Sequence, residues 1–290
     1  QDLLLSLDGG RQVINRVDRK KGAIAVSPSY RTLAGRYAAP MLRLNASHGC
    51  LYACAFCGDA WSRKLYLVEP EALEQEVSQF ERYYPQTTLI YIGDKTFGQS
   101  RDAVANLKNV FRGRPRYRFI VQTHIRQVDE QLVSDMTELG VVAVEMGFET
   151  ADSDLLRASR KGTLPEQSYD AVLDLLNRAR LKVVLNVLGG LPHETATSHS
   201  ATLRRLREWR QRVWLYNLYN FVPYPLTPYF AELKPRIFNW NFSDWREDAP
   251  PVFTPYHHTP EESWSRFLQK VEAAHHAIGV HTAASVLAAG

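Results

Sequence analysis

The stretch from Leu44 to Asp59 reads LNASHGCLYACAFCGD and holds all three cysteines of this 290-residue chain, at positions 50, 54 and 57. The spacing Cys-x3-Cys-x2-Cys places three thiolates on one short loop. Thiolates are soft ligands, which favour zinc or iron–sulfur clusters over hard cations. Because an odd number of cysteines cannot complete a set of disulfides, the stretch predicts a metal site in the reducing cytoplasm.

Two metal centres are compatible with these thiolates. A [4Fe–4S] cluster takes four ligands, so with three cysteines in the chain one iron is left open to a ligand that is not a protein thiolate. A zinc site of the Cys3His type would instead recruit His48, and the chain would then be a zinc-stabilised binding protein without catalysis. Zinc sites of that kind usually occur in small domains, whereas this loop follows the first strand of a long strand–helix series, which favours the cluster.

Outward from the loop, short apolar segments alternate with segments of helical periodicity. We predict strands at 41–46, 88–93, 118–123, 141–148, 182–189 and 213–222. We predict helices at 69–83, 100–111, 129–138, 195–210 and 260–278, and a pair of helices within 153–179. Such alternation indicates a parallel sheet covered by helices, either doubly wound or curved into a partial barrel. In both architectures the reactive site lies at the carboxyl ends of the strands.

The charge balance argues against a nucleic-acid binder. Lys and Arg number 35 against 31 Asp and Glu, a net charge of +4, whereas nucleic-acid binders concentrate positive charge on one face. Two local basic clusters, 16–21 and 112–116, are expected to be solvated turns. The chain has no apolar run long enough for a membrane helix and no pattern of a secretory signal. We therefore expect a small-molecule substrate, and neither a membrane nor a nucleic acid as partner.

The cysteine motif, its place after the first strand and the six strand–helix units resemble the radical SAM superfamily over about residues 40–230. The resemblance implies a partial (β/α)6 TIM-type barrel, with segments similar to the cobalamin-dependent and methylthiotransferase-like branch. It implies a [4Fe–4S] cluster on Cys50, Cys54 and Cys57, with S-adenosylmethionine on the open iron. It also implies reductive cleavage to a 5′-deoxyadenosyl radical, which takes hydrogen from the substrate, and a reductant such as flavodoxin or ferredoxin.

The same resemblance implies which residues meet S-adenosylmethionine. Phe56 occupies the aromatic position of the motif, and Gly93 and Asp94 stand where the family has a Gly-Gly-Glu-like segment. The remaining predicted contacts lie at or after later strand ends: Glu149, Thr150, Arg157, Arg160, Gly189, Gly190 and Val222. Lys161 follows Arg160 in the region where a basic residue often meets the methionine carboxylate.

The lack of further cysteines limits the chemistry. No auxiliary cluster, methyl-carrying thiol or thiol hydrogen donor can be formed, so a tyrosine is the natural relay, and we predict Tyr216 or Tyr219 in that catalytic role. We predict substrate contacts at His124, Arg126 and Tyr224. The reaction would be an elimination, decarboxylation, C–C bond formation or redox rearrangement of a sugar, nucleoside or related natural-product intermediate, in the lyase, oxidoreductase or transferase class. An RNA-modifying radical SAM enzyme is the alternative within the family.

We divide the chain into three parts. Residues 1–40 form an extension with a β-hairpin over about 3–15, too short for a cobalamin-binding domain. Residues 41–230 form the partial barrel, and the aromatic-rich residues 231–290 cover the substrate and end in a helix.

Overall fold

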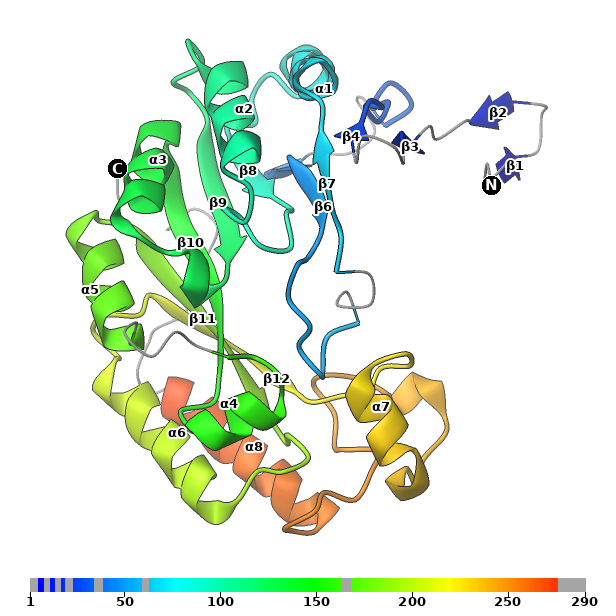
Figure 1. Cartoon of the computed structure of the whole chain (residues 1–290), viewed down its shortest axis with the longest axis vertical. Coiled ribbons are helices and arrows are strands. Elements are labelled where there is room, and N and C mark those ends of the chain that lie inside the picture. The colour runs from blue at the N-terminus through cyan, green and yellow to red at the C-terminus, as the bar shows by residue number, and fades with distance from the viewer. Residues whose placement is uncertain are drawn as a thin grey trace.

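A computed structural model describes residues 5–7, 11–13, 17–18, 23–33, 39–58, 63–162 and 168–275. A six-stranded sheet in the order β12–β11–β10–β9–β8–β5 forms its centre (Figure 1). Its strands are β5 (Leu42–Leu44), β8 (Leu89–Ile92), β9 (Arg118–Thr123), β10 (Val141–Glu149), β11 (Lys182–Gly189) and β12 (Leu215–Asn220). All neighbouring strands are parallel. Because the spatial order follows the chain order without a reversal, the sheet is a partial barrel and not a doubly wound sheet, which confirms the predicted fold class.

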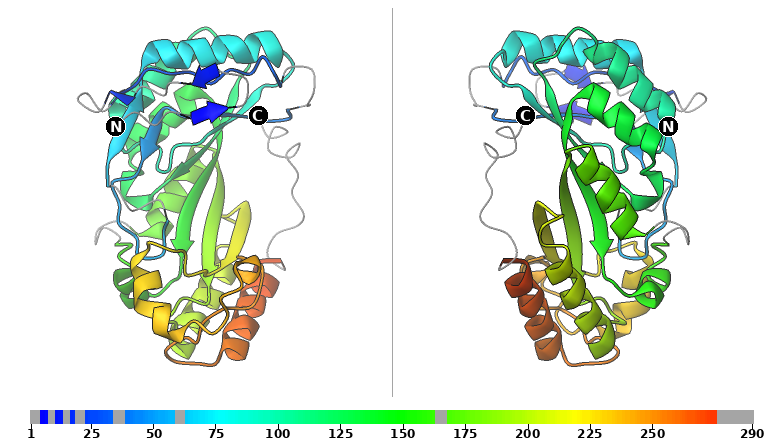
Figure 2. Two further views of the ribbon diagram at one scale, coloured as in Figure 1. Left: turned by 90° about the vertical axis from the view of Figure 1, so that its right-hand side faces the viewer. Right: turned by 90° about the vertical axis from the view of Figure 1, so that its left-hand side faces the viewer.

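Helices cover one face of the sheet. They are α1 (Pro70–Tyr83), α2 (Arg101–Phe111), α3 (Glu130–Leu139), α4 (Ser153–Ala158), α5 (Tyr169–Arg178) and α6 (Ala196–Glu208). Thus 153–179 holds two helices, as predicted. The other face of the sheet, which we call the inner face, is turned toward the viewer on the left of Figure 2. Helix starts follow from their caps; the Asp129 carboxylate, for example, accepts from the Leu132 amide of α3 at 2.7 Å.

The cysteine loop connects two strands of a second, smaller sheet, which the hydrophobic periodicity of the sequence did not predict. Strands β6 (Ser47–Gly49) and β7 (Leu65–Val68) pair antiparallel on either side of the loop. They continue through β4 (Ala23–Ile24) to β3 (Val17–Asp18) in the order β3–β4–β7–β6. The predicted strand 41–46 therefore ends early, at Leu44. The loop forms the end of a β-ribbon beside the barrel, whereas we predicted it directly after the first strand.

The two ends of the chain add further elements. Strand β1 (Leu5–Leu7) pairs antiparallel with β2 (Arg11–Val13), as the predicted hairpin requires. After β12 come α7 (Pro228–Leu233), two 3-10 turns, η2 (Lys234–Arg236) and η3 (Phe242–Asp244), and α8 (Pro260–His275). Helix α8 packs against α6, β11 and β12, and its predicted continuation to 278 lies outside the described residues. None of the described helices has the length and apolarity that a membrane span requires.

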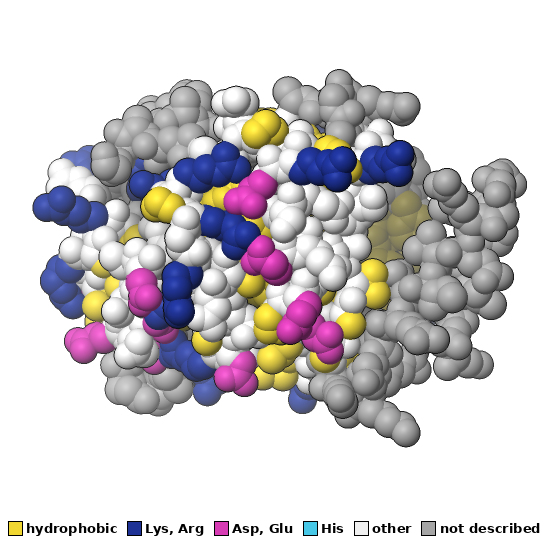
Figure 3. All heavy atoms as spheres, turned by 90° about the horizontal axis from the view of Figure 1, so that it is seen from above, with side chains coloured by type: hydrophobic (Ala, Val, Ile, Leu, Met, Phe, Trp, Pro, Cys, Tyr) yellow, Lys and Arg dark blue, Asp and Glu magenta, His cyan; other side chains and the backbone are white. Residues whose placement is uncertain are grey.

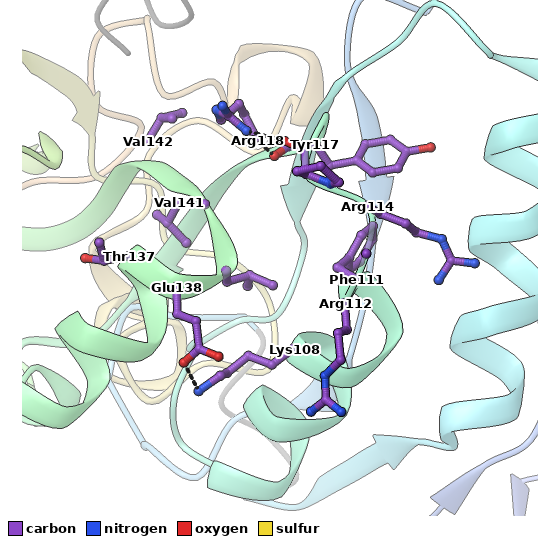
Figure 4. A pocket seen from close by; sticks show the side chains of 14 residues that line it. Lys108, Phe111, Arg112, Arg114, Tyr117, Arg118, Thr137, Glu138, Val141 and Val142 are labelled. Carbon is purple, nitrogen blue, oxygen red and sulfur yellow. Dashed lines mark hydrogen bonds and ion pairs between the residues drawn. The ribbon is translucent and has the colours of Figure 1, made fainter.

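The amino ends of the strands form the opposite end of the barrel from the cysteine loop. Figure 3 looks onto this end, where Lys and Arg side chains are interspersed with Asp and Glu side chains. A pocket of about 650 Å³ opens there between α2 and α3, lined in part by the basic cluster 112–116 (Figure 4). Carboxylates already pair with two of its cations: Lys108 with Glu138 at 2.6 Å, and Arg114 with Glu81 at 3.1 Å.

Candidate cluster and cofactor site

Three separate parts of the barrel hold the cysteine loop in place. The Ala55 amide donates to the Ser159 carbonyl after α4 at 2.8 Å, and the Tyr229 amide of α7 donates to the Ala55 carbonyl at 3.1 Å. Beyond the end of β8, Thr96 Oγ1 lies 3.6 Å from Cys50 Sγ. The loop is therefore fixed against segments that follow β8, β10 and β12.

The three thiols differ in exposure. Cys54 is buried, whereas Cys50 and Cys57 are partly exposed, and all three are free of disulfides. Burial raises the pKa of the Cys54 thiol to about 12, and the nearby Lys161 ammonium acts in the opposite direction. Since thiolates bind metal, binding at Cys54 would release its proton. Three soft donors on one anchored loop, with no fourth cysteine in the chain, fit an iron–sulfur cluster with one open iron.

A buried ion pair stands at the end of β10. Glu149 and Lys161 pair with side chains that are 8% and 6% exposed. Glu149 has a φ of +62°, and the pairing of β10 with β11 shifts between Gly147 and Glu149. At Gly147 an added Cβ would lie 2.1 Å from Lys161 Nζ, so glycine is the residue that leaves room for the pair.

Of the three basic residues predicted near the methionine carboxylate, Arg157, Arg160 and Lys161, the fold buries Lys161. The side chain of Arg157 is 70% exposed and pairs with Asp154 on the surface of α4. Its partner belongs to the same helix, and the contact of Arg157 with the cofactor stays a prediction. Arg160 is also exposed, and its contact with the cofactor stays a prediction.

The carboxylate of Asp94 is committed to the protein itself. Asp94 is buried and accepts from the Ala46 amide at 2.8 Å, the Ser47 amide at 3.0 Å and the Ser47 hydroxyl at 2.6 Å. It therefore ties the connection between β5 and β6 to the end of β8. These three bonds account for the burial of the carboxylate, and its contact with the cofactor stays a prediction.

The glycine of the same segment allows β5 and β8 to approach closely. An added Cβ at Gly93 would lie 2.3 Å from Arg43 Nε and 2.7 Å from Asn45 Oδ1. The Gly93 amide donates to the Leu44 carbonyl at 2.7 Å. Its contact with the cofactor stays a prediction.

The other predicted cofactor residues divide between the two faces. Thr150 is fully buried, and its hydroxyl lies 3.0 Å from that of Thr202 in α6. Because it points into the helix layer, Thr150 does not face the loop, which corrects our assignment. Phe56 and Val222, in contrast, belong to one apolar cluster that joins the loop to the segment after β12.

The two glycines after β11 make room for neighbouring elements. An added Cβ at Gly189 would lie 2.5 Å from the Phe267 ring of α8, and one at Gly190 would lie 2.5 Å from Asn220 Oδ1. Gly190 also has a φ of +66°, which favours glycine. The packing accounts for both glycines, and their approach to a ligand stays a prediction.

The alternation of side chains along β12 separates the two candidate tyrosines. Tyr216 is buried, and its hydroxyl donates to the Leu206 carbonyl of α6 at 3.1 Å. It therefore lies on the helix-covered face, which corrects our assignment of Tyr216 to catalysis. Tyr219 lies on the inner face, where burial and the charges of Glu145, Glu247 and Glu149 raise its pKa.

His124 is the predicted substrate residue that the structure brings to the cysteine loop. Its ring stacks on Tyr52 of the loop with centroids 4.0 Å apart. Its Nδ1 accepts from the Arg126 amide at 3.2 Å, and its buried Nε2 has no partner within the described residues. Burial and the charge of Lys161 lower its pKa to about 3. Arg126 itself is exposed, and the Tyr224 hydroxyl donates to Glu247 near the surface at 2.8 Å.

Sequence reasoning missed a row of polar residues across the inner face. The Tyr91 hydroxyl donates to Glu145 at 3.1 Å, Asn186 donates to Glu145 at 2.7 Å, and Asn217 donates to Asn186 at 3.0 Å. Each strand contributes one member: Arg43, Tyr91, Gln122, Glu145, Asn186 and Asn217. A polar residue between two apolar or aromatic neighbours, as in β5, β8, β10, β11 and β12, is the signal that could have found this row, which we call the inner polar row.

The fold and the loop together define a parallel α/β barrel with a thiolate loop at the carboxyl ends of its strands. The chain belongs to the radical SAM superfamily, which residues 44–206 match. This confirms the family predicted from the motif and, with it, the [4Fe–4S] cluster and S-adenosylmethionine as the cofactors of the family.

Individual relatives differ in activity. The chain is 23% identical over 227 residues to the anaerobic magnesium-protoporphyrin IX monomethyl ester cyclase of Cereibacter sphaeroides, covering 76% of this chain and 36% of that protein. It is 29% identical over 107 residues to the bacteriochlorophyllide d C-12(1)-methyltransferase of Chlorobaculum tepidum, covering 36% of this chain and 23% of that protein. The chain therefore spans only a minor part of these curated relatives.

Among solved structures, the fold is similar to the radical SAM methyltransferase TsrM of Kitasatospora setae with cobalamin and a [4Fe–4S] cluster bound. The TM-score is 0.66 at 16% identity, covering 97% of this chain and 62% of that one. At this identity the similarity shows the fold alone, and it supports the partial barrel.

Proposed function

We propose that this chain carries the catalytic barrel of a radical SAM enzyme, which cleaves S-adenosylmethionine reductively and takes a hydrogen atom from a small polar substrate. The observation that carries the proposal is the anchored loop of three thiols. Its backbone is bonded to the segments after β10 and β12, so the thiols stand where the reactive site of such a barrel belongs.

The cysteines would hold the cluster and leave one iron for S-adenosylmethionine. When bound, these cofactors supply the one-electron chemistry that makes a C–H bond reactive. Lys161, the buried cation at the end of β10, is placed to attract the methionine carboxylate, and Glu149 beside it can accept from hydroxyl or ammonium groups. The apolar cluster with Phe56 and Val222 would keep water from the adenosyl side.

The inner polar row supports a polar substrate. Half-buried amide, phenol and carboxylate groups on the inner face offer donors and acceptors that an apolar ring system would leave unpaired. We infer that the reaction is an elimination, decarboxylation, C–C bond formation or redox rearrangement in natural-product biosynthesis. We further propose a cytoplasmic location and a flavodoxin or ferredoxin as reductant.

Anaerobic reconstitution with iron and sulfide tests the proposal. We expect about four iron and four sulfide per chain, brown protein, and 5′-deoxyadenosine release with S-adenosylmethionine and dithionite. Replacing Cys50, Cys54 or Cys57 by alanine should abolish the bound cluster and the release of 5′-deoxyadenosine, whereas R157A should change neither. Stoichiometric zinc in colourless, folded protein would instead support the zinc-stabilised binding protein, and salt-sensitive binding of tRNA would favour the RNA-modifying enzyme.

A second candidate function is the barrel of a methyltransferase that works with cobalamin held outside the described residues. The similarity to a methyltransferase in sequence and to a cobalamin-bound one in fold favours it. Titration of the reconstituted protein with hydroxocobalamin, followed by its visible spectrum, tests this candidate. A saturable spectral shift supports it, and an unchanged spectrum contradicts the binding of cobalamin by this chain itself.

A further inference from the structure

We propose that Glu145 binds an ammonium group of the substrate, so that the substrate class is a small-molecule amine. The inference rests on the proposed function, because it takes the inner face of the barrel as the place where the substrate lies. It names the residue that selects the substrate and the group that is selected.

The carboxylate of Glu145 is oriented by two neutral donors. Its Oε2 accepts from the Tyr91 hydroxyl at 3.1 Å and its Oε1 accepts from Asn186 Nδ2 at 2.7 Å. A carboxylate has about four acceptor positions, so about half of them stay available. Because β8 and β11 hold the two donors on either side, the carboxylate cannot turn away without losing both bonds.

No cation of the described residues forms an ion pair with Glu145. Two other carboxylates of the barrel, in contrast, each have a lysine partner. Glu149 pairs with Lys161 and Glu194 pairs with Lys270, and all four side chains are buried. Glu145 is only partly buried, between Tyr91 and Asn186, and an ion pair at such a site is stronger than one in open water because the local dielectric constant is lower. A ligand ammonium would supply both the charge and the missing donors.

The surroundings of Glu145 fit a bound amine. The Asn186 and Asn217 side chains are bonded to each other at 3.0 Å and continue the row toward β12. Tyr219 is also on the inner face, where burial and then the charge of Glu145 raise the pKa of its hydroxyl. The faces of such aromatic rings attract cations. At the β5 end of the row, the Arg43 guanidinium lies 5.5 Å from the centre of the Tyr91 ring.

The position of Glu145 along β10 also fits. It lies four residues before Glu149 on the same strand, a rise of at most about 13 Å at about 3.3 Å per residue, since the register shift between Gly147 and Glu149 interrupts the extended strand. An amine bound at Glu145 would therefore place the far end of a small molecule near the end of β10, where Glu149 and Lys161 stand beside the cysteine loop.

Isothermal titration of the reconstituted protein with S-adenosylmethionine present tests the inference, with serinol (2-amino-1,3-propanediol) and glycerol as probes. The two probes differ only in the amine and the hydroxyl. We expect the amine to bind at least about tenfold more tightly. We expect E145Q to remove this preference, E145D to keep part of it, and E208Q, which alters an exposed carboxylate of α6, to keep all of it.

Equal affinities in the unaltered protein, no binding of the amine, or a preference that survives in E145Q would each overturn the inference. The comparison of the two probes on the unaltered protein needs no variant, so a misfolded variant cannot hide the result. 5′-Deoxyadenosine release without substrate is measured in parallel. If it is absent, the proposed function fails; if it is present while the preference is absent, only the assignment of Glu145 fails.

Discussion

Lys270 of α8 and Glu194 after β11 form an ion pair in which neither side chain is exposed to solvent. The Lys270 ammonium also donates to the Leu188 carbonyl at 3.2 Å. The pair joins the last described helix to the loop that follows β11, beside Gly189 and Gly190. The end of the barrel that carries the cysteine loop thus depends on a helix far away in the sequence.

Removing the cation alone should destabilise the fold strongly. In K270M, Glu194 would stay buried without a partner, at a cost of about 3–5 kcal/mol in the free energy of unfolding. Urea denaturation measures this change. The double variant K270M/E194Q should recover part of the loss, and R157A, which breaks an exposed pair, should cost at most about 1 kcal/mol. A loss in K270M as small as that in R157A would contradict the prediction.

The buried pair at the end of β10 should govern the affinity for S-adenosylmethionine. In K161M the cation is lost beside Glu149, and we expect the affinity to fall at least about tenfold. Equilibrium dialysis of reconstituted protein measures it, with the iron content checked in the same samples. R157A serves as the control because its arginine is exposed. Unchanged affinity in K161M would remove Lys161 from the site.

The two tyrosines of β12 should separate stability from turnover. Y216F loses the bond to the Leu206 carbonyl and should reduce the free energy of unfolding by about 1 kcal/mol without changing turnover. Y219F should reduce substrate turnover while leaving stability and 5′-deoxyadenosine release unchanged. Urea denaturation and product analysis of both variants check this. The prediction is wrong if Y216F lowers turnover or if Y219F leaves it intact.

His124 should make the protein less stable in acid. Its folded pKa, about 3, lies below the usual value of 6.5, so the folded state disfavours its protonated form. Its contribution is therefore complete above pH 6.5 and is lost as the pH falls toward 3, to an extent of a few kcal/mol. Urea denaturation at several pH values measures the loss. H124N should flatten the dependence, whereas H257N, which alters an exposed histidine, should not.

Most of the strands and helices could be predicted because each carries its own period. Strand β9 and the interval containing α4 and α5 agree with the predicted positions, since apolar runs and turn residues are local signals. Strands β6 and β7 were missed because three or four residues are too few for a period. They exist because each backbone pairs with the other across the cysteine loop, a contact between distant residues.

The sequence by itself determined the family, the cysteine loop and the positions of most strands along the chain, because spacing and periodicity are properties of neighbouring residues. Only the tertiary structure decided which side chains meet. Tyr216 faces the helices and Tyr219 faces the inner side of the sheet. Lys161 is buried whereas Arg157 is exposed, and the Asp94 carboxylate accepts from Ser47. The physical reason is that a side chain's role depends on the face of the strand it occupies and on the donors already bonded to it. Those partners come from strands and helices far along the chain.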